Sequence, residues 1–146
     1  MFKWQLSGLL FGSISTFAQV IEPLDFGTLV IVQNNQESSI SVFHDGRVVT
    51  SGLYTHTRGH PALLIVDSLQ PNSRVYISDN VSQARLNNNL DNQHFIVEKL
   101  LYRQSQITDQ HGELELSIGA MLKTSANGRP YYDGQYSCVL EISVDY

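Results

Sequence analysis

The sequence predicts an all-β protein built as a sandwich of two sheets. Residues 136–146 place an apolar side chain at every second position, with polar residues at most of the positions between them. Residues 114–122 repeat this pattern, and a period of two is typical of a strand with one buried face. Asp45-Gly46, set between two β-prone runs, is a strong hairpin signal. Together these features favour strands joined by tight turns.

The remaining strands are predicted from short β-prone runs bounded by turn residues. In chain order these strands are residues 26–32, 38–43, 47–51, 62–66, 74–78 and 95–101. Turn signals separate them at Asn34-Asn35, Gln70-Pro71-Asn72, Asp79-Asn80, His111-Gly112 and Asn127-Gly128. About eight short strands at such spacing favour a sandwich. The polar stretch 83–93 is predicted to be a long loop with at most one helical turn.

Composition narrows the class of function. The chain has 146 residues, which suits a single domain with its own core. Charged residues make up 16% of it, against about 25% in an average soluble domain. The net charge of −5 provides no basic footprint, which argues against nucleic-acid binding. No phosphate-binding loop, zinc motif or nucleophile elbow is present, so we expect no enzyme activity and no cofactor.

The first 18 residues have the pattern of a signal peptide. Lys3 gives a short positive start, an apolar stretch follows, and Thr16-Phe17-Ala18 ends it with small residues where cleavage requires them. We predict cleavage after Ala18, which leaves a single domain over residues 19–146. The alternative is a buried N-terminal strand or helix. No second apolar segment follows that would hold the mature chain in a membrane.

The few residues able to carry chemistry have simple structural explanations. His56 and His60 flank Thr57-Arg58-Gly59, but Gly59 and Pro61 predict a loop there, so a metal site is disfavoured. Glu113 and Glu115 share one face of a predicted strand, where a solvated pair is more typical than catalysis. Cys138 is the single cysteine, so no internal disulfide can form, and it is expected to pack as a small hydrophobe.

Several blocks of the sequence resemble a known group of proteins. The segment 23–29 is similar to a Leu-x-Phe-Gly-x-Leu opening, 117–122 to a Val-Gly-Ala-x-Leu strand, and 134–146 to a closing Gly-x-Tyr strand. Further similar blocks lie at 45–52, 61–66 and 74–78. The chain departs from the pattern at residues 36–40, where Gly-Thr-Val is often found. It also departs at position 138, where Cys138 replaces the usual glycine. The blocks resemble an uncharacterised domain family of small secreted, pilin-like bacterial proteins, similar to chaperone–usher fimbrial subunits.

This resemblance implies an immunoglobulin-like, pilin-like sandwich that is either complete or lacks one strand. An incomplete sandwich would receive a strand from a partner at its open edge. The expected edge is the last strand, carried by Tyr136, Cys138, Leu140, Ile142, Val144 and Tyr146. The implied partners are a periplasmic chaperone, an outer-membrane usher and neighbouring subunits. The implied location is the periplasm or the cell surface. Residues 19–23 are short for a donor strand, which argues against polymerisation by this segment.

Two functions therefore stay open at this point. The first is a structural or adhesive subunit of a fimbria-like fibre, assembled by strand addition. The second is a self-contained secreted or periplasmic binding module that does not polymerise. A module would fold alone as a monomer, whereas an incomplete subunit would be unstable or oligomeric without its partner.

Overall fold

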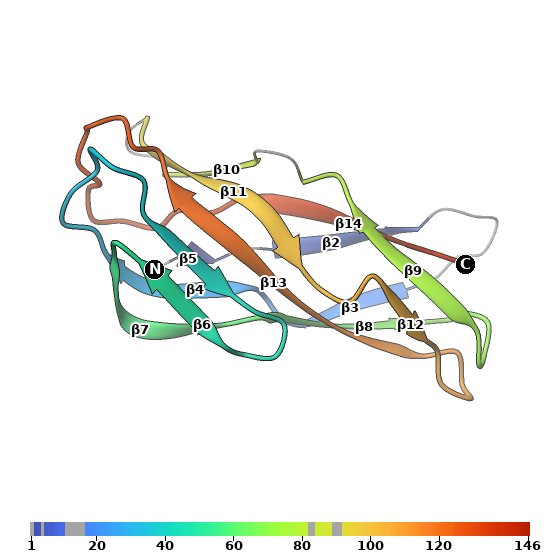
Figure 1. Cartoon of the computed structure of the whole chain (residues 1–146). Helices are drawn as coiled ribbons and strands as arrows, with labels where there is room; N and C mark the ends of the chain where they lie inside the picture. The colour runs from blue at the N-terminus through green and yellow to red at the C-terminus, as the bar shows by residue number, and fades with distance from the viewer. Residues whose placement is uncertain (1, 4, 11–16, 82–83, 89–91) are drawn as a thin grey trace.

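The all-β prediction is confirmed by the structure, a computed structural model that describes residues 2–3, 5–10, 17–81, 84–88 and 92–146. Every regular element in these residues is a β-strand (Figure 1). None of the described residues belongs to a helix that is long and apolar enough to cross a membrane. The sheets are largely antiparallel and curl around one core, as in a β-sandwich.

The strands fall into three hydrogen-bonded groups. The first runs β1–β4–β7, with β1 (Phe2–Lys3), β4 (Asp25–Val30) and β7 (Tyr54–His60). The second runs β10–β11–β13–β5–β6, and β3 and β8 join it through β13. The third runs β12–β9–β14–β2. The remaining bounds are β2 (Gln5–Leu10), β3 (Phe17–Glu22), β5 (Ser39–Val42), β6 (Val48–Ser51), β8 (Ala62–Asp67), β9 (Arg74–Asp79), β10 (Ala84–Asn87), β11 (His94–Leu101), β12 (Ser105–Ile107), β13 (Leu114–Thr124) and β14 (Val139–Asp145).

The long strand β13 organises the second group. Its first half pairs with β8, with Leu114 opposite Val66. Its second half pairs with both β5 and β11, where Ala120 lies opposite Val42 and Leu100. Gly119 permits this crowding, because a Cβ added there would lie 1.8 Å from the backbone oxygen of Val42. In Figure 1, β13 accordingly runs through the middle of the molecule.

The predicted core residues of the two alternating runs are buried together. Leu116, Ile118 and Ala120 of β13 and Leu140, Ile142 and Val144 of β14 each expose 5% of their surface or less. They share one cluster with Phe26, Phe95 and Tyr136, among others. The period-two pattern therefore identified the inward faces correctly.

Two segments predicted to be loops contain strands, and both predictions were wrong. Residues 56–60 belong to β7, where Gly59 allows a close approach to β4: a Cβ on Gly59 would lie 2.1 Å from the backbone oxygen of Asp25. Likewise, a Cβ added to Gly27 would lie 2.0 Å from the backbone oxygen of Thr57. Within the predicted loop 83–93, residues 84–87 form β10, which pairs with β11 along its length. In both cases sheet pairing overrides a local sequence that favours a turn.

One further strand was not predicted, and the last strand begins later than predicted. The short edge strand β12 pairs with β9 and was not anticipated from the sequence. The last strand begins at Val139 rather than at Tyr136. The residues just before it form only an isolated bridge, in which Ser137 pairs with Asn87 at the end of β10. The apolar alternation continues through this stretch although the strand does not.

Candidate functional site

The candidate site begins with the two edges of β14. One edge pairs antiparallel with β9, from Ile142 opposite Asp79 to Asp145 opposite Tyr76. The other edge, at Val139–Val144, pairs in parallel with β2, from Val139 opposite Gln5 to Val144 opposite Leu10. We call this second edge the acceptor edge. Its partner lies within the segment predicted to be removed as a signal peptide, and that prediction of cleavage stays a prediction.

The six residues expected to mark this edge divide into three kinds. The side chains of Tyr136, Leu140, Ile142 and Val144 are buried in the core. Cys138 is half-buried against the same cluster, and burial raises the pKa of its thiol to about 11, so it stays protonated at neutral pH. Tyr146 is exposed, and its hydroxyl oxygen accepts a hydrogen bond of 2.7 Å from the backbone N–H of Gln70. What these residues offer a partner is therefore mainly backbone.

A ring cluster lies directly before β14 in the chain. Phe95 of β11 stacks on Tyr131 with ring centroids 4.3 Å apart, and it meets Tyr136 edge to face at 5.1 Å. The Tyr131 hydroxyl donates to the backbone oxygen of His94 and accepts from the N–H of Ser125. Burial raises the pKa of Tyr131, so its hydroxyl stays neutral. These contacts hold the segment 131–136 against the first residues of β11.

A network of side-chain amides fixes the turn that leads into this segment. The Asn34 amide donates to Ser125, Asn127 and the backbone oxygen of Arg129 at 2.9–3.1 Å. The Gln93 amide donates to the same oxygen of Arg129 at 2.9 Å and to Asn127. Asn34 and Gln93 are almost fully buried. Because buried amides are costly unless hydrogen-bonded, this network specifies one conformation of the turn.

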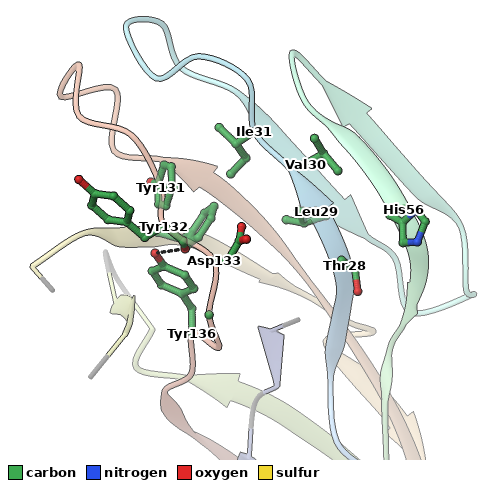
Figure 2. Close-up of a pocket in the computed structure, with 11 residues that line it drawn as sticks. Thr28, Leu29, Val30, Ile31, His56, Tyr131, Tyr132, Asp133 and Tyr136 are labelled. Atoms are coloured by element: carbon green, nitrogen blue, oxygen red, sulfur yellow. Dashed lines mark hydrogen bonds between the residues drawn. The ribbon is translucent and has the colours of Figure 1, made fainter. Parts of the chain in front are cut away.

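A cleft of about 530 Å³ lies between the 131–136 segment and β4. We call it the tyrosine cleft; its lining is Thr28, Leu29, Val30, Ile31, His56, Phe95, Tyr131, Tyr132, Asp133, Gly134 and Tyr136. In Figure 2 Leu29 and Asp133 project into it from opposite walls. The Tyr136 hydroxyl donates to the backbone oxygen of Tyr132 at 3.2 Å along one wall. This volume is in the range that accepts a small ligand or a large side chain.

Sequence reasoning missed this cleft, although it weighed its member His56. The run 130–136 holds three tyrosines between a proline and β14, which is a usable sign of a ring cluster, but β4 and β7 complete the site only in three dimensions. The other candidates remain apart. His56 and His60 lie four residues apart on one strand, which separates them by about 13 Å. Glu113 and Glu115 are exposed, as expected of a solvated pair.

No metal site emerges within the described part of the chain, where no group of three or more His, Cys, Asp or Glu side chains is arranged to hold an ion. A second, smaller cleft of about 260 Å³ is lined by His44, Asp45, Arg103, Gln106, Glu115 and Ser117. Its charges are mixed, and Asp45 is engaged by the side chain and backbone of Arg47 at 3.0 Å. That engagement, led by the Arg47 backbone N–H, holds the pKa of Asp45 below its usual value.

The fold and site thus define a small all-β protein in which β14 pairs with β9 on one edge and with an N-terminal segment on the other. Residues 15–146 match the family model DUF4402, described as a domain of unknown function. The chain belongs to this uncharacterised family. Comparisons with curated proteins and with solved structures found no significant match.

Proposed function

We propose that this chain is an exported bacterial structural subunit of a fimbria-like surface fibre, assembled by strand addition at the acceptor edge. The observation that carries the proposal is the pairing of Val139–Val144 with residues 5–10. If the signal peptide is removed, that edge loses its partner while the opposite edge keeps β9. Six consecutive unpaired residues on a strand are a template for another strand. The proposed occupants are a periplasmic chaperone during export, and then, after delivery to an outer-membrane usher, a neighbouring subunit.

The N-terminal segment limits what the subunit can donate. Gln19–Glu22 lies within β3, which pairs with β8 from Phe17 to Glu22. Four residues extended cover about 13 Å, whereas the six residues of the acceptor edge cover about 20 Å. The proposed subunit is therefore an acceptor, placed at the end of a fibre where it need not donate a full strand.

The test uses the chain from Gln19 to Tyr146 and a synthetic peptide with the sequence of residues 2–10. We expect the chain alone to self-associate or to melt early, and the peptide to raise Tm and return it to a monomer in sedimentation. A scrambled peptide should do neither. Mass spectrometry of exported protein checks the start at Gln19, and an intact Met1 there would contradict the premise.

A matched pair of variants links the effect to the acceptor edge. The exposed Glu141 lies on β14 outside its pairing with β9. Glu141→Pro removes a backbone N–H and should weaken peptide binding, whereas Glu141→Lys keeps the N–H and should bind normally. Circular dichroism confirms that both variants are folded. A stable monomer that no peptide affects would instead favour the self-contained binding module, with the tyrosine cleft as its site.

A further inference from the structure

The tyrosine cleft gathers polar side chains that the fold itself does not use. Thr28 of β4, His56 of β7 and Asp133 of the 131–136 segment all line it. Thr28 lies opposite Thr57, the residue after His56, so the first two come from neighbouring positions on paired strands. Within the described residues, none of the three side chains takes part in a hydrogen bond or an ion pair. The cleft therefore presents a hydroxyl, an imidazole and a carboxylate that are open to a ligand.

Asp133 differs in this respect from other aspartates of the chain. The carboxylates of Asp25, Asp79 and Asp109 each accept hydrogen bonds of 2.7–2.9 Å from nearby backbone N–H groups, which fixes the backbone around them. Asp133 is exposed and projects into the cleft from the wall opposite Leu29 (Figure 2). A carboxylate in this position has two oxygens with which it can accept hydrogen bonds from two neighbouring donors of a ligand.

Apolar surface lies beside these polar groups. Leu29 and Ile31 are half-buried on the β4 wall, and Tyr131 is half-buried on the other. The hydroxyls of Tyr131 and Tyr136 donate to backbone oxygens, so these side chains offer the cleft ring carbons rather than hydrogen-bonding groups. One ligand can therefore meet an apolar surface and a set of hydrogen-bonding groups at the same time.

A sugar ring combines the same two features. One side of a pyranose carries mostly C–H groups, and its rim carries hydroxyls that both donate and accept hydrogen bonds. A carboxylate accepts from such hydroxyls, whereas a threonine hydroxyl and an imidazole both donate and accept. An anionic ligand fits poorly, because the chain has a net charge of −5 and Asp133 would repel it. An organic cation fits poorly as well, since cation–π binding needs open ring faces and Phe95 and Tyr131 stack on each other.

We propose that the tyrosine cleft binds one pyranose ring of a neutral saccharide. Asp133, Thr28 and His56 hydrogen-bond the hydroxyls of the ring, and its C–H face lies on Leu29 and Tyr131. The cleft volume of about 530 Å³ exceeds what one ring fills, so the ring belongs either to a free sugar or to the end of a longer glycan. The inference goes beyond the proposed function, because no residue of the acceptor edge lines the cleft.

The test titrates the full chain, residues 1–146, with the methyl glycosides of glucose, galactose, mannose and N-acetylglucosamine. Ligand-observed NMR measures binding, because one ring in an open cleft is expected to give a Kd on the order of 1 mM. Oligosaccharides that end in the best-binding sugar then separate the two sources. Binding tighter by about tenfold or more would identify the end of a glycan as the ligand, and equal binding would identify a free sugar.

Matched variants link binding to the cleft. Asp133→Asn should raise Kd by about fivefold or more, because hydrogen bonds to a charged group are the strongest of the set. Thr28→Val keeps the shape of the side chain, removes its hydroxyl and should raise Kd by about threefold. Asp67→Asn removes the same charge from an exposed residue of β8 that does not line the cleft, and it should leave Kd unchanged. Circular dichroism melts confirm that all three variants are folded.

Three results would overturn the inference. The first is that none of the sugars binds, and the second is that Asp133→Asn and Asp67→Asn weaken binding equally. The third is that tetramethylammonium binds and no sugar does, which would make the cleft a cation site. The peptide of residues 2–10 tests the proposed function separately, so either idea can fail while the other stands.

Discussion

β13 and β14 are two long strands that share a sequence pattern but differ in the strands that pair with their edges. Both alternate apolar and polar residues, and both bury their apolar face in one core. β13 pairs with β8, β5 and β11, so its second half is flanked on both edges by strands from the middle of the chain. β14 has β9 on one edge, and among the described residues its other edge is covered by residues 5–10 alone.

The comparison shows that alternation reports the faces of a strand and not its edges. A buried face requires apolar side chains at every second position, and this holds equally for a central and a terminal strand. Pairing at the edges uses backbone groups that every residue except proline possesses, so it leaves little trace in residue types. Experiments that separate face from edge therefore sharpen the comparison.

The largest expected effect concerns the faces, where the two strands should behave alike. Ile118→Asp in β13 and Ile142→Asp in β14 each bury a carboxylate among apolar side chains, at positions exposed by 0% and 1%. Either change should abolish cooperative folding, as unpaired buried charges do. Circular dichroism melts check this. Ile→Val at the same two positions should cost only about 0.5–1.5 kcal/mol. A folded Ile142→Asp variant would contradict the inward assignment of β14.

The next effect concerns the edges, where the two strands should differ. In the chain from Gln19 to Tyr146, the outward-directed amides of Val139–Val144 should exchange with solvent rapidly, while those of the doubly paired part of β13 stay protected. Hydrogen exchange followed by mass spectrometry or NMR measures both strands in one sample. Adding the peptide of residues 2–10 should protect β14 alone. Equal protection of both strands without peptide would mean that β14 has found another partner.

A smaller effect tests how tightly β13 is enclosed. Gly119→Ala places a methyl group 1.8 Å from the backbone oxygen of Val42, so β13 and β5 must separate. We expect a loss of about 1–3 kcal/mol in the free energy of unfolding, measured in urea. Glu141→Gln, at an exposed site on β14, should stay within about 0.5 kcal/mol of the wild type. A neutral Gly119→Ala would show that β13 and β5 approach less closely.

The smallest effect lies at Cys138, just before β14. Burial raises the pKa of this thiol to about 11, and the thiolate is the reactive form. Iodoacetamide at pH 8 should therefore modify the folded chain much more slowly than the chain in urea. Because the folded pKa lies above the unfolded one, the contribution of this group to stability is full below about pH 9 and is lost as pH rises toward 11. Rapid modification of folded protein would show an accessible edge there.

The sequence predicted the strands whose apolar alternation is strong. It missed strands that depend on tertiary contacts. All eight predicted strands correspond to strands in the structure, with β13 extended to Thr124 and β14 shortened to begin at Val139. β7 was missed because Gly59 and Pro61 favour a turn locally, whereas Gly59 is needed for the close approach to β4. β10 and β12 were missed because short edge strands carry little alternation.

The sequence by itself determined that this protein is all-β, where its main turns fall, and which faces of its longest strands are buried. These features depend on side-chain size and polarity, which the residue types state directly. Only the tertiary structure decided that β14 lies between β9 and an N-terminal segment while the second half of β13 lies between β5 and β11, and that Leu29 and Asp133 face each other across a cleft. Such features depend on backbone pairing between segments more than a hundred residues apart, and many sequences satisfy that pairing equally well.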